Sequence, residues 1–91
     1  MPGTMICHEG LLELKKHDEE NQTQYMETLR VYLKQHLSAT QAARELFIHR
    51  STFLYRLDRI KEILQSELDD PEEIFYLELS FRLLEQEQEK E

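Results

Sequence analysis

The sequence predicts an all-α fold, a small bundle of four or five helices that contains a helix-turn-helix. Apolar residues recur at spacings of three and four, which is the period of one helix face, and strand-type alternation is absent from the pattern. Only two Gly and two Pro occur among 91 residues, so residues that favour tight turns are scarce. A chain of this length forms one domain with a small core.

Composition narrows the class of protein. With 40% hydrophobic and 33% charged residues, the chain is typical of a soluble globular domain. Cys7 is the one cysteine, which excludes an internal disulfide framework. No apolar run approaches the roughly 20 residues of a membrane span, and no signal-peptide pattern begins the sequence. We therefore expect a cytoplasmic protein with no membrane partner.

The N-terminal part is expected to hold two helices. Residues 1–7 carry no pattern and are interpreted as a disordered or linker segment. Residues 8–17 fit a short helix, and the polar run at 18–22 is expected to end it. Thr23 is the expected N-cap of a second helix, which ends near residues 36–37.

The helix-turn-helix is predicted at residues 40–65. Thr40 is the expected N-cap of its first helix, over residues 41–46, where Ala42 and Ala43 are small enough to let another helix come close. The turn is short, so the two helices must cross sharply.

The second helix of the pair, over about residues 50–65, is the predicted recognition helix. Its buried stripe follows spacings of four, three and four: Phe53, Leu57, Ile60 and Leu64. Leu54 lies outside this stripe, and the spacing does not explain it.

A last helix is predicted after a loop at 65–69, because Asp70 and Pro71 form a strong helix start. One side of this helix carries Ile74, Leu77, Phe81 and Leu84. Further apolar residues lie on its other sides and are expected to form a dimer interface: Phe75, Leu79 and Leu83. They could instead cover the first helix of the same chain or dock a sensor domain. The domain should span 8–85, with a frayed charged tail at 86–91.

Charge is unevenly distributed along the chain. The net charge is −8, made of −2 over residues 1–43, +3 over 44–61 and −9 over 62–91. A basic segment between acidic flanks is compatible with DNA binding, because phosphate attraction acts within a Debye length of about 8 Å. Three net charges give one copy only weak nonspecific affinity, so two copies on one duplex are expected.

We interpret helix 50–65 as a reader of the major groove of double-stranded DNA. An α-helix fits this groove, and residues near the helix N-terminus meet base edges first. Four residues are expected to face the groove: Arg50, Ser51, Thr52 and Tyr55. Three are expected to face the phosphate backbone: His49, Arg56 and Arg59. The alternative is an exposed face that is basic by chance.

The sequence favours neither a metal site nor an enzyme. The four histidines and Cys7 form no pair with metal-ligand spacing, so we expect no metal and no cofactor. His49, Ser51 and Asp58 could be combined into a triad, but the chain has no nucleophile elbow and no Gly-rich loop.

One stretch resembles a known family. The run SATQAARELFIHRSTFLYRLDRIKEIL, followed by LDDPEEIFYLELSFRLL, resembles the C-terminal DNA-binding domain of PucR/CdaR-type bacterial transcriptional regulators. The pattern A-x-x-L-F-I-H-R-x-T-x-x-Y-R-L falls on Ala43, Leu46, Phe47, Ile48, His49, Arg50, Thr52, Tyr55, Arg56 and Leu57. The resemblance covers about residues 8–84. The helix pair is also similar to that of the Fis nucleoid protein, whose relatives bind as homodimers.

The resemblance implies a DNA-reading domain that is joined to an N-terminal sensor outside this chain. The expected function is sequence-specific binding of double-stranded DNA in a bacterial transcriptional regulator. The alternative is an acidic helical module for protein interaction or dimerisation, without DNA binding.

Overall fold

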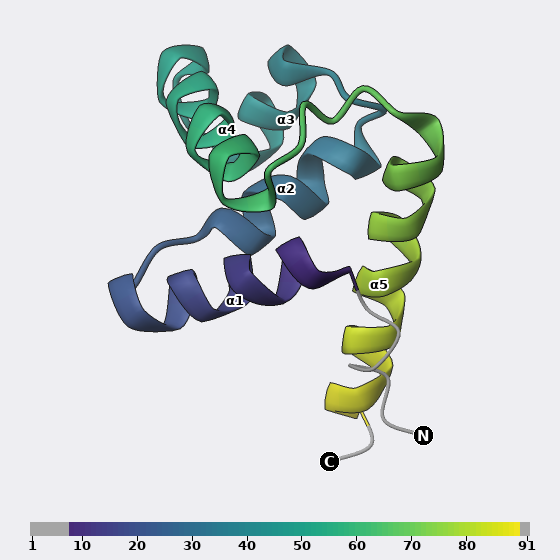
Figure 1. Ribbon diagram of the computed structural model, residues 1–91. Helices are drawn as coiled ribbons and strands as arrows, with labels where there is room; N and C mark the ends of the chain where they lie inside the picture. The colour runs from purple at the N-terminus through teal and green to yellow at the C-terminus, as the bar shows by residue number, and fades with distance from the viewer. Residues whose placement is uncertain (1–7, 90–91) are drawn as a thin grey trace.

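The computed structural model describes residues 8–89, and this part of the chain folds into five α-helices without strands. They are α1 (Glu9–Asn21), α2 (Tyr25–Lys34), α3 (Ala39–Leu46), α4 (Arg50–Leu64) and α5 (Pro71–Glu89) (Figure 1). The all-α prediction is therefore confirmed. The prediction for residues 1–7 falls outside the described residues, and so do the last two residues of the predicted tail.

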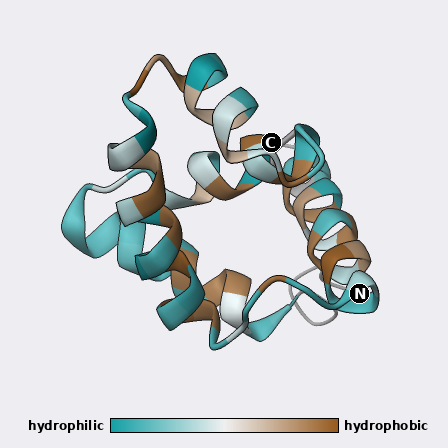
Figure 2. Ribbon diagram, turned by 90° about the horizontal axis from the view of Figure 1, so that it is seen from above, coloured by the Kyte–Doolittle hydropathy of each residue, from teal (hydrophilic) through white to brown (hydrophobic). Residues whose placement is uncertain are grey.

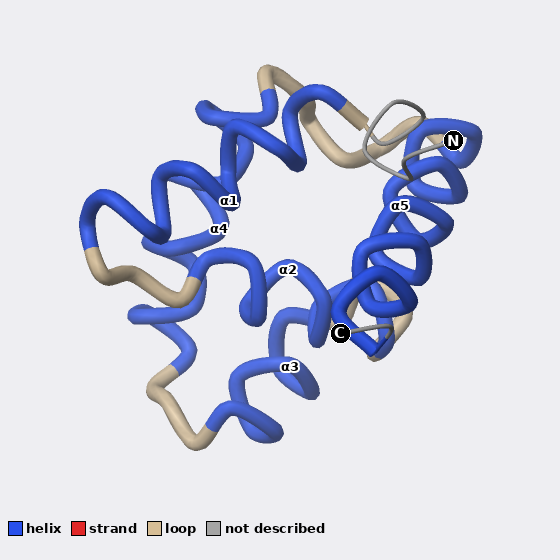
Figure 3. Tube along the Cα trace, turned by 90° about the horizontal axis from the view of Figure 1, so that it is seen from below, coloured by secondary structure: helices blue, strands red, loops and turns tan. Residues whose placement is uncertain are grey.

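Helix α2 is the centre of the arrangement, because it contacts each of the other four helices. Helices α4 and α5 lie on opposite sides of it (Figures 1 and 3). None of the described helices combines the length and the apolar character that a membrane-spanning helix needs.

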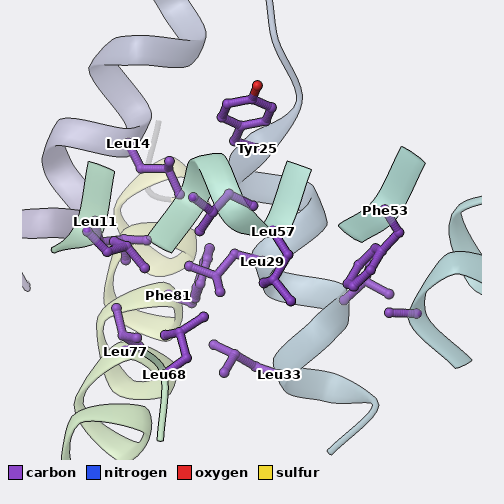
Figure 4. Packing of buried hydrophobic residues seen from close by; sticks show 14 of the residues in the cluster. Leu11, Leu14, Tyr25, Leu29, Leu33, Phe53, Leu57, Leu68, Leu77 and Phe81 are labelled. Atoms are coloured by element: carbon purple, nitrogen blue, oxygen red, sulfur yellow. The ribbon is translucent and has the colours of Figure 1, made fainter. Parts of the chain in front are cut away.

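A single apolar core joins the five helices. Figure 4 shows Leu29 and Leu33 of α2 between side chains of α4 and α5. The stripe predicted on α4 is confirmed, since its four members are all buried: Phe53, Leu57, Ile60 and Leu64. Fully burying one such side chain stabilises the fold by roughly 1.5–3 kcal/mol. This packing fixes which face of α4 remains on the surface.

The junction of α1 and α2 differs from the prediction. Helix α1 continues through the polar run to Asn21, and α2 has Gln24, not Thr23, at its N-cap position. The amides at the start of α2 are capped by Asp18, whose carboxylate accepts from Tyr25 N at 3.0 Å and Met26 N at 2.8 Å. The Thr23 hydroxyl also donates to Asp18 Oδ1. The Asp18 carboxylate of α1 thus accepts hydrogen bonds from backbone amides of the next helix. N-cap preferences describe only residues adjacent to the helix start, so they do not predict this contact.

Two further helix boundaries are shifted. Helix α2 ends at Lys34, earlier than expected, and a turn follows in which His36 and Leu37 have positive φ. Helix α3 begins one residue before Thr40, and its N-cap is Ser38, whose Oγ accepts from Gln41 N at 3.2 Å. The extended backbone of Ser38 suits this role.

Helix α5 begins at Pro71 as predicted, and Asp70 Oδ1 accepts from Glu72 N at 3.1 Å. Its predicted inner side is confirmed for the three buried residues Leu77, Phe81 and Leu84, and Ile74 packs against them while partly buried. The loop before α5 holds an anchor that the sequence did not reveal, because Leu68 is also buried.

The start of α1 is fastened to α5 by His8. The His8 backbone N–H donates to Ser80 Oγ at 2.9 Å. The ring Nδ1 accepts from Gly10 N, so the neutral ring carries its hydrogen on Nε2, which lies 2.9 Å from Glu73 Oε2. The Ser66 hydroxyl donates to the other Glu73 oxygen. Together these bonds fix the direction of α5 relative to α1.

Candidate nucleic-acid interface

Helices α3 and α4 form a compact pair joined by a turn at residues 47–49. Ala42 and Ala43 are buried, and their small side chains allow the close approach that the sequence predicted. The end of α3 is closed by Ile48 N donating to Ala43 O at 3.1 Å and Phe47 N donating to Arg44 O at 3.2 Å. This pair of bonds is a Schellman motif, and it directs the chain from α3 into α4.

The first turn of α4 is organised by His49. Its Nδ1 accepts from Ser51 N at 3.1 Å and lies 2.8 Å from Ser51 Oγ, so His49 is the N-cap of α4. Because Nδ1 is the acceptor, the neutral imidazole carries its hydrogen on Nε2. The exposed ring therefore has a hydrogen-bond donor available for a partner outside the chain.

The surface of α4 outside the buried stripe is exposed. It carries all four residues that were predicted to face the groove: Arg50, Ser51, Thr52 and Tyr55. Arg50 has neither an ion pair nor a side-chain hydrogen bond to any residue between 8 and 86, the range whose side chains the structure describes. Its guanidinium can thus offer all of its N–H donors.

Leu54 lies on this same exposed face, one helical turn after Arg50. The sequence spacing gave it no role. The signal that could have identified it is the phase of the helix, which places Leu54 about 90° from the centre of the stripe and within one turn of Arg50 and Ser51.

The two later arginines are engaged within the fold. Arg56 Nη1 donates to Thr28 Oγ1 of α2 at 3.2 Å, and Arg56 is half-buried. Arg59 forms an ion pair with Glu62 at 3.3 Å, on the surface. An exposed pair of this kind is worth only about 0–1 kcal/mol, so Arg59 can exchange it for a phosphate.

A shallow hollow connects α4 with the loop between α1 and α2. Thr52, Tyr55 and Arg56 line one side of it, and residues 22–25 line the other. This neighbourhood could not be predicted from the sequence, because it depends on how α1 is placed against α4. Polar side chains of this loop, such as Gln22 and Gln24, are exposed beside the predicted site.

The residues that the structure describes favour neither a metal site nor a reactive carboxylate. Between residues 8 and 86 no three His, Cys, Asp or Glu side chains come together as a metal site. Glu45 on α3 has its pKa lowered because Gln35 and Lys34 donate hydrogen bonds to it. This shift reflects a surface contact between α2 and α3 rather than a reactive group.

The sequence model of one protein family, the PucR C-terminal helix-turn-helix domain, matches residues 25–83, which is more than half of the chain. The chain belongs to this family. Members of the PucR helix-turn-helix family are DNA-binding domains of transcriptional regulators and are not enzymes. The predicted resemblance and the predicted absence of enzymatic activity are therefore confirmed.

Three relatives from Bacillus subtilis (strain 168) are similar to this PucR-family chain. The purine catabolism regulatory protein is 37% identical over 80% of the chain and 14% of its own length. The proline-responsive transcriptional activator PutR is 38% identical over 69% of the chain and 15% of its own length. The DNA-binding transcriptional activator AdeR is 30% identical over 81% of the chain and 18% of its own length. No solved structure matches.

The PucR-family match begins at the first residue of α2 and ends within α5. It therefore includes the whole helix-turn-helix and the helix that supports it. Helix α1, which caps α2 through Asp18, lies before the matched residues.

Proposed function

We propose that α4 enters the major groove of double-stranded DNA and that the chain binds a specific sequence as the DNA reader of a bacterial transcriptional regulator. The observation that carries this proposal is Arg50, an exposed cation without a partner among the described residues, in the first turn of α4. Helix-turn-helix proteins use this part of the second helix to contact base edges.

The residues are assigned different tasks. Arg50 donates in bidentate fashion to guanine O6 and N7, the commonest specific contact of arginine in the major groove. Ser51, Thr52 and Tyr55 complete the groove-facing set. His49 uses its Nε2 hydrogen for a phosphate, and Arg56 and Arg59 contact the phosphate backbone, which positions the domain without specifying sequence.

We also propose that two copies bind together. The +3 net charge of residues 44–61 is small for phosphate attraction from one copy. Phe75 is 66% exposed and Leu79 is 42% exposed, one helical turn apart on α5. Leu83 continues this side of α5 but is half-buried against its own core. Packing of Phe75 and Leu79 against a second copy would remove their apolar surface from water, which favours association.

We propose that the reading unit spans residues 8–85, with its helix-turn-helix at 40–65, inside a longer cytoplasmic regulator. The chain spans about a seventh of the first two relatives, which supports a sensor domain elsewhere in such a regulator. One of these relatives, PutR, is a proline-responsive activator. By analogy, we propose that the sensor domain of this regulator responds to a small effector molecule. When bound, the protein would be associated with the nucleoid.

The test of DNA recognition compares Arg50→Ala with Arg82→Ala. Both variants lose one positive charge, but Arg82 is exposed on α5. A binding site is first selected from random duplexes, and affinity is then measured by fluorescence anisotropy. Arg50→Ala should lose roughly 1–3 kcal/mol on the selected site and tolerate base changes at one position. Equal affinity of both variants would refute the role of Arg50. Failure of the unmodified chain to select any duplex would favour the rival function, an acidic module for protein interaction.

The test of dimerisation is Phe75→Glu combined with Leu79→Glu, followed by sedimentation velocity. Self-association of the unmodified chain should be lost in the double variant, because two buried carboxylates cannot be solvated in an apolar contact. A monomeric unmodified chain, both free and on DNA, would rule out the paired arrangement.

A further inference from the structure

Phe47 is the most exposed large apolar residue in the described part of the chain, with 94% of its surface open to solvent. It is the first residue of the turn between α3 and α4, three residues before Arg50. Figure 3 shows this turn projecting at the lower left, away from α5, and Figure 2 shows its apolar colour at the upper left.

The backbone of Phe47 is in the left-handed region, with φ of 58°. It occupies the position in the Schellman motif that glycine usually fills, because a side chain there meets the following carbonyl. Phenylalanine is unfavourable at this position, and its ring contacts too little of the core to offset that cost. The fold alone therefore does not account for this residue.

The ring lies beside the groups assigned to DNA. The turn continues from Phe47 through Ile48 to His49, whose ring caps α4. Ile48 packs against the core, which anchors the middle of the turn and leaves Phe47 outside. An exposed aromatic ring at the entrance of the recognition helix can be buried when the helix enters the groove.

We propose that Phe47 is a DNA-contacting residue that packs on an apolar part of the duplex, either a thymine methyl group or a deoxyribose. This inference rests on the proposed function of α4. Thymine C5-methyl groups line the major groove and are contacted by apolar side chains, including Phe. The ring thus adds hydrophobic affinity to a site that carries little net positive charge.

The experiment uses Phe47→Gly, with Gln65→Gly as its matched control. Gln65 also has positive φ, 56°, in a Schellman motif, but it lies at the far end of α4. Both substitutions relieve the same backbone conformation, and both variants should be at least as stable as the unmodified chain in urea. Only Phe47→Gly should bind DNA more weakly, by about tenfold. Phe47→Leu, which keeps an apolar side chain, should retain most of the affinity.

The two apolar surfaces are distinguished by replacing thymine with uracil in the selected duplex. If the unmodified chain and Phe47→Gly then bind equally well, the ring contacts a thymine methyl group. If the tenfold difference persists, the ring packs on deoxyribose. Either result supports the proposal.

Unchanged affinity of Phe47→Gly, with Arg50→Ala still impaired, would overturn this inference and leave the proposed function standing. If Phe47→Gly instead lost self-association at full DNA affinity, the ring would belong to a contact between copies, and the inference would also fail. Absence of DNA binding by the unmodified chain would overturn both.

Discussion

Arg56 of α4 donates from Nη1 to Oγ1 of Thr28, which is fully buried in α2. The same hydroxyl donates to Gln24 O at 2.7 Å, so Thr28 holds the guanidinium without being left unsatisfied. One N–H of Arg56 is used in this way, and the remaining donors of its planar group are available to a phosphate. The central helix thereby sets the direction of a residue assigned to the DNA backbone.

Replacing Arg56 with Ala should weaken binding to all duplexes by a similar factor. Because a phosphate contact releases counterions, the slope of log affinity against log salt should become less steep by about 1. Anisotropy titrations at several salt concentrations measure this slope. Arg82→Ala removes the same charge from α5 and should leave the slope unchanged. An unaltered slope for Arg56→Ala would assign the residue to the fold alone.

Asp18→Ala should destabilise the domain by about 2 kcal/mol, because three donors lose their acceptor. These donors are Thr23 Oγ1, Tyr25 N and Met26 N. Urea denaturation followed by circular dichroism gives the free energy of unfolding. Glu19→Ala, the neighbouring exposed acid, should have little effect. Similar unfolding curves for the two variants would show that the cap is dispensable.

The domain should lose stability at acid pH because the Glu73 carboxylate becomes protonated. Hydrogen bonds from Ser66 and then from His8 hold the pKa of Glu73 below its ordinary value of 4.5. A carboxylate with a lowered pKa in the folded state contributes stability above its unfolded pKa and loses it as pH falls through the folded pKa. Melting temperatures of Glu73→Gln should be lower at neutral pH and should decline less on acidification below about pH 5.

The control for Glu73 is Glu78→Gln, since Glu78 is exposed on the same helix and has no side-chain partner among residues 8–86. Its melting temperature should follow the unmodified chain across the pH range. A Glu73→Gln profile parallel to that of Glu78→Gln would remove Glu73 as a source of acid sensitivity.

Gln65→Gly should stabilise the domain by about 0.5–1 kcal/mol, since Gln65 closes α4 with positive φ. For a domain of this size, 1 kcal/mol raises the melting temperature by roughly 4–8 °C. Glu13→Gly, an exposed position inside α1, should shift it in the opposite direction. A lower melting temperature for Gln65→Gly would mean that the Gln65 side chain itself contributes to the fold.

The features that the sequence predicted well are local ones. The α4 stripe depends on side-chain spacing within one helix, and the start of α5 depends on Asp70 and Pro71 alone. The exposed face of α4 follows directly from the stripe, so the groove-facing residues could be proposed before the fold was known.

The features that the sequence missed depend on distant parts of the chain. The polar run at 18–22 is expected to end the first helix, but α1 continues to Asn21. The Asp18 carboxylate is occupied by the next helix, which removes its competition with the α1 backbone. Leu68 lies in the predicted loop, but its burial in the core was not predicted. Thr28 and Ser80 are buried polar residues whose hydroxyls accept from distant donors, Arg56 Nη1 and His8 N respectively.

The placement of α4 and α5 on opposite sides of α2 gives the domain an electric dipole moment. Residues 44–61, which include most of α4, carry +3, and residues 65–86, which include most of α5, carry −6. In the field of a phosphate backbone this dipole experiences a torque that turns α4 toward the duplex and α5 away from it. Diffusional encounters are therefore oriented before any contact forms, and a strongly acidic chain can still approach DNA with its basic side first.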